Sequence, residues 1–149
     1  MEAIIFIGLQ ATGKSTFYKD NLFKTHIRIN LDMLKSRNSE DILLEACVKA
    51  KQPFVVDNTN PTPMDRKKYI DIAKAAKFKV VGYYFQSNIN EAVLRNEKRQ
   101  GKEFVPLAGI RSTYAKLHLP DKAEGFDELY YVYINEENKF VVEEWKNEV

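Results

Sequence analysis

An apolar run that breaks into a glycine-bounded loop constrains this chain more than any other feature. The run, residues 3–7 (AIIFI), has the length and composition of a strand buried on both faces of a parallel sheet. The loop that follows, residues 8–15 (GLQATGKS), matches the phosphate-loop pattern G-x-x-x-x-G-K-[ST] in full. A helix is expected over residues 14–22, so the motif stands between a strand and a helix, as this loop requires. The sequence therefore predicts an α/β fold that binds a nucleoside triphosphate.

Each part of the loop suits a triphosphate. The glycines let the backbone curl so that successive N–H groups converge on phosphate oxygens, and the next helix directs the positive end of its dipole at the same anions. Lys14 can reach the β- and γ-phosphates, and the Ser15 hydroxyl can bind Mg²⁺. Ala11 stands where many small kinases have glycine, so a left-handed backbone there would be strained. The residues of this loop predicted to bind the nucleotide are Gly8, Gln10, Ala11, Thr12, Gly13, Lys14, Ser15 and Thr16.

The rest of the chain alternates between strand-like and helix-like segments. Further strands are expected at residues 26–29, 53–57, 79–85, 129–134 and 140–142, and further helices at 39–51, 63–77, 88–100 and 106–117. Asn38 or Ser39 is expected to cap the helix at 39–51, and Thr62, with Asp65 three residues later, the helix at 63–77. This alternation predicts a parallel sheet flanked by helices with right-handed crossovers. The last two strands are expected to form an antiparallel hairpin at one edge. We find no repeat and no linker, so one domain over residues 1–149 is predicted.

Composition and charge narrow the setting. Hydrophobic residues make up 44% and charged residues 30% of the chain, as in an ordinary globular protein, and no apolar run approaches the ~18 residues of a membrane span. The first strand leaves no room for a secretory signal, and the single Cys47 suits a reducing compartment, so a cytoplasmic protein is expected. Residues 66–102 hold ten Lys/Arg against three Asp/Glu, which favours a polyanionic partner or a solvated helix face.

A phosphate loop alone does not separate a kinase from a GTPase or a motor protein. The chain lacks the Asn-Lys-x-Asp motif with which GTPases read their base, and it is much shorter than most motors. A small kinase remains, which needs a base for the acceptor hydroxyl and cations for the γ-phosphate.

Asp32 is the candidate base. It follows the strand-like residues 26–29, at the edge of the sheet where open α/β folds bind their ligands. Lys35 and Arg37 follow within about a turn and are candidates to hold a phosphate of the acceptor. The alternative for Asp32 is a helix N-cap.

Asp57 ends the apolar strand of residues 53–57 and is the candidate metal acid. It could bind Mg²⁺ directly, through water or through Ser15. Asn58, Thr59 and Asn60 follow it as candidate substrate-binding side chains, the alternative being turn formation and helix capping.

Arg95 and Arg99 are four residues apart on an expected helix, so they are predicted to share one face and to form a cationic lid over the nucleotide. The alternative is a pair of arginines on a solvated helix.

Five segments together resemble the kinase domain of the phage-type polynucleotide 5′-hydroxyl kinases, which also occurs in the animal polynucleotide kinase-phosphatases. These segments are "GLQATGKSTF", "INLDMLKSR", "VVDNTNPT", "LRNEKRQGKEFVP" continuing into "IRSTYAKLHLP", and "EGFDELYYVYI". The resemblance covers nearly the whole chain. It implies a P-loop fold and Mg²⁺-dependent transfer of the γ-phosphate of ATP to the 5′-hydroxyl end of DNA or RNA.

The resemblance also implies roles for individual residues. Asp32 matches the general base, Lys14 and Ser15 match the nucleotide and metal residues, and Arg95 and Arg99 match the lid arginines. Asp57 matches an essential acid of the family. Where phage-type enzymes carry an arginine for the acceptor's 3′-phosphate, this chain has Lys35, which keeps the charge without the bidentate fork; Arg37 is a candidate substitute.

Two other functions stay open from the sequence. One is a P-loop kinase that acts on a small metabolite or antibiotic, because the architecture serves both kinds of acceptor. The other is an ATP-dependent binding module without chemistry, for which the strained Ala11 is the only support. We find neither an Asp-x-Asp phosphatase motif nor a Lys-x-Asp-Gly ligase motif, so removal of 3′-phosphates and ligation are not expected.

Overall fold

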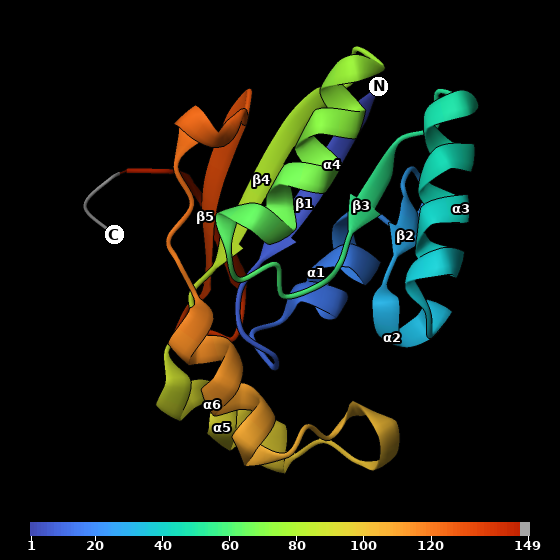
Figure 1. Ribbon diagram of the computed structural model, residues 1–149. Helices are drawn as coiled ribbons and strands as arrows, with labels where there is room; N and C mark the ends of the chain where they lie inside the picture. Colours follow the sequence, from blue (N-terminus) through green and yellow to red (C-terminus); the bar gives the residue numbers. More distant parts are fainter. Residues whose placement is uncertain (147–149) are drawn as a thin grey trace.

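A six-stranded sheet forms the centre of the computed structural model, which describes residues 1–146. The strands lie in the order β2-β3-β1-β4-β5-β6 (Figure 1). Their bounds are β1 Glu2–Ile7, β2 Ile27–Ile29, β3 Phe54–Val56, β4 Lys79–Phe85, β5 Glu128–Ile134 and β6 Phe140–Glu144. Strands β1 to β5 run parallel, and β6 pairs antiparallel with β5. The predicted parallel sheet and closing hairpin are confirmed.

Helices cover both faces of this sheet. Their bounds are α1 Lys14–Asn21, α2 Leu31–Leu34, α3 Arg37–Lys49, α4 Pro63–Ala75, α5 Ile89–Glu97 and α6 Leu107–Lys116, with short 3₁₀ turns η1 Gly101–Glu103 and η2 Lys122–Glu124. One core cluster joins α3 and α4 to the sheet through Leu44, Cys47 and Tyr69. A second cluster joins α1 to the other face through Phe17 and Tyr18. The pleat explains this division, because alternate residues of β1 belong to opposite clusters.

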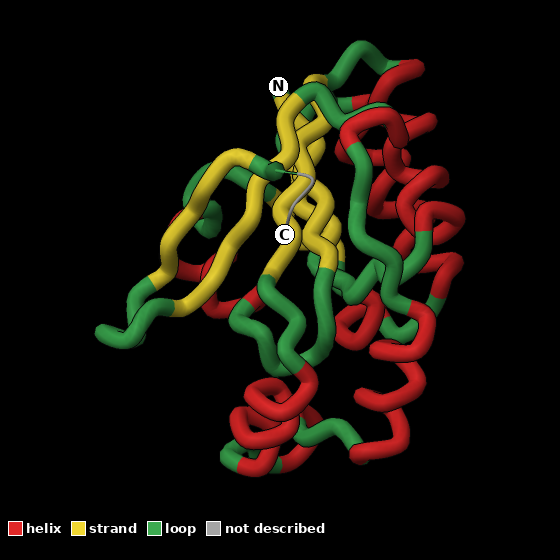
Figure 2. Tube along the Cα trace, turned by 90° about the vertical axis from the view of Figure 1, so that its left-hand side faces the viewer, coloured by secondary structure: helices red, strands yellow, loops and turns green. Residues whose placement is uncertain are grey.

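The carboxyl ends of the parallel strands all meet at one edge, and this edge positions the site. Strand β1 leads there into the loop of residues 8–13, β2 into α2, and β3 into residues 57–62. Helices α5 and α6 lie beyond the same end of the strands in both views (Figures 1 and 2). Asn96 fixes the segment between these two helices, since its side chain bonds both the N–H and the C=O of Val105.

Helix starts were predicted with mixed success. Thr62 caps α4 as expected, and Asp65 closes a capping box with it. For α3 the expected cap at Asn38 or Ser39 is wrong: Ser36 caps the helix, and its hydroxyl accepts a hydrogen bond from the Ser39 N–H. Ser36 is as suitable an N-cap by residue type as Asn38 or Ser39, so residue type alone could not show which of the three begins the helix.

The expectations about Cys47 and about membrane spans can be compared with the described residues. Cys47 is buried among apolar side chains, and this burial raises the pKa of its thiol. Within residues 1–146, no helix combines the length and the apolar character that crossing a bilayer would demand.

Arg66, which the sequence placed in the basic stretch, is a buried brace. Its side chain is 0% exposed and pairs with Glu124 at 3.0 Å. The guanidinium also donates to the carbonyl oxygens of Asn60 at 2.9 Å and Pro61 at 3.1 Å, and to that of His118. Arg66 therefore ties the segment after β3 to the chain around η2 and is not available to a polyanion.

We expect Arg66→Met to lower the free energy of unfolding by about 3 kcal/mol, because it removes the cationic partner of Glu124 and one donor from each of three carbonyl groups. Urea unfolding measures this loss. The matched control is Lys67→Met on the same helix, where the side chain is 67% exposed and its pair with Asp71 is worth roughly 0.3–0.5 kcal/mol. Equal losses of unfolding free energy in the two variants would contradict this structural role of Arg66.

Candidate active site

The phosphate loop adopts the curled backbone that its glycines permit. Gly13 is the N-cap of α1 with φ +95°, and a Cβ there would lie 2.8 Å from a ring carbon of Phe140. Only glycine therefore fits at this point. Ala11 has φ +61°, so the left-handed backbone expected there is present, held in a loop where its methyl group is 4% exposed.

Hydrogen bonds within the protein hold the loop in place. The N–H of Gly8 donates to the Thr59 carbonyl at 3.0 Å, and the N–H of Leu9 donates to the Ser87 hydroxyl at 3.0 Å. The Thr12 hydroxyl donates to the Leu9 carbonyl at 2.8 Å, so it braces the loop. The first N–H groups of α1 have no intrahelical partner, which leaves them for an anion.

Lys14 lies folded back over the loop. Its Nζ donates to the Gly8 carbonyl at 3.0 Å and to the Leu9 carbonyl, and the residue is 8% exposed. Burial lowers the pKa of Lys14 to about 8; the charge of Asp57 opposes this shift, and that of Arg99 adds to it. The ammonium is thus close to both a carboxylate and a guanidinium that come from other parts of the chain.

This lowered pKa predicts proton uptake on nucleotide binding. At pH 8 a lysine with a pKa of about 8 is half neutral, and phosphate oxygens beside Nζ favour its charged form, so binding should take up about half a proton. Affinity should therefore fall as the pH rises above 8. Calorimetry of ATP-analogue binding in buffers with different ionisation enthalpies measures the uptake. It should persist in the α1 surface variant Lys19→Met and vanish in Lys14→Met; uptake in both would contradict the assignment.

Ser15 and Asp57 contact each other, which is one of the arrangements that the sequence left open, and a third residue joins them. The Ser15 hydroxyl donates to Asp57 Oδ2 at 2.9 Å. Arg28 Nε donates to the same Oδ2 at 2.8 Å, and Arg28 Nη2 donates to Ser15 Oγ at 2.9 Å. Sequence analysis missed Arg28; the available signal was a charged residue in the middle of a short strand that ends beside the candidate base.

The donor set at Ser15 and Asp57 fits Mg²⁺. Hydroxyl and carboxylate oxygens are the ligands that this ion prefers, and it usually completes its shell with water and substrate phosphates. Within residues 1–146, no group of three or more His, Cys, Asp or Glu side chains could hold a metal by itself. Ser15 and Asp57 would therefore hold the ion only together with the phosphates of the nucleotide.

Asp32 faces the same cavity as the phosphate loop. A cavity of about 800 Å³ is lined by Asp32 together with Lys14, Ser15 and Asp57. Strand β2 ends at Ile29 and Asp32 lies in α2, so the N-cap alternative for Asp32 is wrong: Asn30 caps this helix and accepts a hydrogen bond from the Met33 N–H.

Two asparagines hold α2 and hence Asp32 in position. Asn30 Nδ2 donates to the Asp57 carbonyl at 2.5 Å, and Asn58 Oδ1 accepts the Leu31 N–H at 2.9 Å. Asn60 is buried with φ +44°, and its side chain donates to the Phe6 carbonyl at 2.8 Å. Asn58 and Asn60 thus join distant segments of the chain and also line the cavity, so their role in substrate binding stays a prediction.

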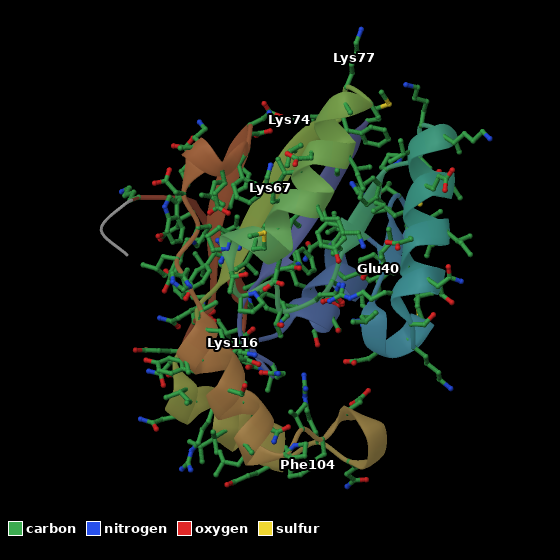
Figure 3. The ribbon with its side chains drawn as sticks, viewed as in Figure 1. Glu40, Lys67, Lys74, Lys77, Phe104 and Lys116 are labelled. Atoms are coloured by element: carbon green, nitrogen blue, oxygen red, sulfur yellow. The ribbon has the colours of Figure 1, made fainter. Side chains whose placement is uncertain are left out.

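A buried carboxylate that the sequence did not reveal organises the side chains of Arg37, Asn58, Lys68 and Tyr69, which line the cavity. Glu40 is 0% exposed and accepts hydrogen bonds from Tyr69 at 2.8 Å, Arg37 at 3.1 Å, Asn58 at 3.2 Å and Lys68 at 3.3 Å. Burial alone would raise the pKa of Glu40, but the hydrogen bonds from Tyr69, Lys68 and Arg37 together hold it below its ordinary value. Glu40 is labelled on α3 in Figure 3.

Arg37 and Lys35 are placed differently. Arg37 lines the cavity with its side chain 61% exposed, whereas Lys35 is the exposed C-cap of α2 with φ +69° and does not line it.

The lid arginines separate because α5 is shorter than expected. The helix ends at Glu97, so Arg99 lies beyond it and the two arginines do not share a helical face. Arg99 lines the cavity and donates to the Glu103 carbonyl at 3.2 Å. Arg95 is 36% exposed, lies 3.8 Å from Glu91 and does not line the cavity.

Gln10 connects the phosphate loop to α6. Its Nε2 donates to the Thr113 hydroxyl on α6 at 3.0 Å, and its Oε1 is buried with no protein partner among the described residues. The cavity-lining residues that the sequence singled out are Gln10, Ala11, Lys14, Ser15, Asp32, Arg37, Asp57, Asn58, Thr59, Asn60 and Arg99. Thr16 is exposed outside it.

Comparison with known families adds to this geometry. The family model AAA_33, described as "AAA domain", matches residues 4–120, which include the phosphate loop, Asp32, Asp57 and the lid. The chain belongs to this AAA domain family. Its P-loop kinase fold agrees with solved structures: Kti12 of Chaetomium thermophilum, in complex with ADP-AlF3, superposes with a TM-score of 0.65 at 17% identity, over 91% of this chain and 92% of that one.

Two curated relatives resemble this AAA domain chain in sequence. A bifunctional polynucleotide phosphatase/kinase of Schizosaccharomyces pombe is 28% identical over 129 residues, which cover 84% of this chain and 32% of the relative. An L-seryl-tRNA(Sec) kinase of Methanococcus maripaludis is 27% identical over 143 residues, covering 83% of this chain and 55% of the relative. The chain thus spans about a third and about half of the length of these two proteins.

Proposed function

We propose that this chain is a polynucleotide 5′-hydroxyl kinase that uses Mg·ATP. The observation that carries the proposal is the placement of Asp32 on the same cavity as Lys14, Ser15, Asp57 and Arg99. An acid on one wall and a phosphate loop with two cations on the other is the arrangement that phosphoryl transfer to a hydroxyl needs.

The residues divide the reaction between them. The 5′-oxygen of the acceptor attacks the γ-phosphorus while Asp32 takes its proton, and the bond from that phosphorus to the β–γ bridging oxygen breaks, releasing ADP. Lys14 and Arg99 offset the negative charge on the transferred group, and the amides at the start of α1 hold the phosphates. Mg²⁺, held by Ser15 and Asp57 with the nucleotide, supplies further charge stabilisation when bound.

The nucleic-acid acceptor is supported by sequence likeness more than by charge. One of the two relatives is named a bifunctional polynucleotide phosphatase/kinase, and the segments quoted above follow that family in order. The basic stretch of residues 66–102 contributes less positive charge to the cavity than its composition suggested. Arg66 is buried, and Lys74 and Lys77 lie toward the C-terminal end of α4, remote from Lys116 and the cavity (Figure 3). Within that stretch Lys68 and Arg99 line the cavity, and Lys14, Arg37 and Lys116 from other parts of the chain line it with them.

Transfer of labelled phosphate from Mg·ATP tests the proposal. A 5′-hydroxyl oligonucleotide should be labelled, and the same oligonucleotide carrying a 5′-phosphate should not. Binding to the phosphate backbone of a nucleic acid releases counterions. The apparent affinity for the oligonucleotide should therefore fall steeply between 50 and 200 mM salt, by about tenfold per few phosphate contacts. Transfer only to a small alcohol, without this salt dependence, would contradict the polynucleotide acceptor and favour the small-substrate kinase. Transfer only to an aminoacylated tRNA would instead match the function in the second relative's name.

A further inference from the structure

We propose that Arg28 competes with the divalent cation for Asp57 and Ser15, and that its displacement sets how strongly nucleotide binding depends on Mg²⁺. This inference rests on the proposed use of Mg·ATP. It concerns a residue that neither the phosphate-loop motif nor the resemblance singled out.

The first support is geometric. Arg28 is the middle residue of the three-residue strand β2, and one guanidinium contacts both candidate metal ligands through two different nitrogens, at 2.8 and 2.9 Å. The third side of this triangle is the 2.9 Å hydrogen bond from Ser15 to Asp57. This planar donor therefore uses the two oxygen atoms that would hold the ion.

The second support is electrostatic. Asp57 is 2% exposed, and a buried carboxylate is costly unless a cation or several donors compensate its charge. In the absence of metal, Arg28 provides both the charge and a hydrogen bond. A divalent ion would compensate the same carboxylate, compete for the same oxygen lone pairs and repel the guanidinium. The two cations are therefore alternative partners of one site.

The third support is that Arg28 has room to leave. Its side chain is 26% exposed, and Nη1 already lies 4.0 Å from the sulfur of Met33, a residue that is itself 51% exposed. The guanidinium can thus turn toward solvent along α2 without disturbing the core. Lys14, by contrast, is enclosed by the loop it serves.

A purely structural role for Arg28 makes the opposite prediction. If Arg28 only kept Ser15 and Asp57 in register, its loss would disorganise both ligands and weaken the metal's contribution. If Arg28 competes with the metal, its loss should strengthen that contribution. The sign of the change therefore separates the two roles.

The experiment measures binding without turnover. The dissociation constant of a non-hydrolysable ATP analogue is determined by calorimetry in EDTA and in excess Mg²⁺, and the ratio of the two constants gives the effect of the metal. We expect Arg28→Gln to raise this ratio about tenfold over the wild type, since the metal no longer has to displace a bound cation. The exposed surface variant Lys49→Gln on α3 should leave the ratio unchanged.

An unchanged or smaller ratio in Arg28→Gln would overturn the proposal. Circular dichroism and thermal melting establish that each variant is folded. Arg28→Lys keeps the charge but loses the planar fork that contacts the two oxygens through two nitrogens, so it should raise the ratio by a smaller factor. It carries the test if the glutamine variant does not fold, and no rise would again overturn the role of Arg28. Failure of the wild type to bind the analogue in either buffer would overturn the nucleotide site itself, and the role of Arg28 with it.

Discussion

Asp32→Asn is expected to lower kcat for phosphoryl transfer about 10³-fold while leaving the affinity for ATP within about twofold, because general-base catalysis typically contributes 10²–10⁴ and the substitution removes only the proton acceptor. The side chain is exposed on the cavity wall, so it is free to meet an acceptor. Asparagine keeps its size, and α2 keeps the caps from Asn30 and Asn58. Single-turnover kinetics with a 5′-hydroxyl oligonucleotide and a parallel ATP-binding titration measure the two quantities.

The control is Asp71→Asn on the outer part of α4, an acid whose side chain is 59% exposed and pairs only with Lys67. It should retain wild-type turnover. If Asp32→Asn retained more than about a tenth of the wild-type kcat, a loss well below that of a general base, Asp32 would not be the proton acceptor.

Arg99→Gln is the second large effect, and we expect a loss of about 10³ in kcat, at the lower end of what an arginine contributes to phosphoryl transfer. Arg99 lines the cavity, and its charge is close enough to contribute to the lowered pKa of Lys14. Arg95→Gln is the matched control. Because Arg95 lies outside the cavity beside Glu91, its loss should stay below about tenfold, as for a surface charge.

The kcat values of Arg99→Gln and Arg95→Gln at saturating ATP measure the two losses. Equal large losses would show that the two arginines act as the pair that their spacing suggested. A loss confined to Arg95→Gln would contradict the placement of both.

The sequence was sufficient where one local pattern carried the information. The apolar run of residues 3–7 and the glycines of the phosphate loop predict the first strand, the loop and α1, because burial and backbone freedom act within about fifteen residues there. Thr62 and Asp65 predict the start of α4 for the same reason. Asp32 and Asp57 were found because parallel strands place their carboxyl ends at one edge.

The rest depends on contacts between distant segments. Arg28 and Glu40 are ordinary charged residues in the sequence, and only the approach of β2, β3 and α4 gives them partners up to 29 residues away. Arg66 was counted as basic surface because nothing local marks a cation that will meet Glu124. Arg95 and Arg99 were paired by helical spacing, which fails once the helix ends at Glu97.

A crystal structure with a non-hydrolysable ATP analogue and a short 5′-hydroxyl oligonucleotide tests the central claim most directly. The account predicts the triphosphate on the amides that begin α1, and a carboxylate oxygen of Asp32 within about 3 Å of the 5′-oxygen, the reach of a general base. An oligonucleotide end that lies outside the cavity shared by Lys14 and Asp32, with that carboxylate turned away from the γ-phosphate, would contradict it.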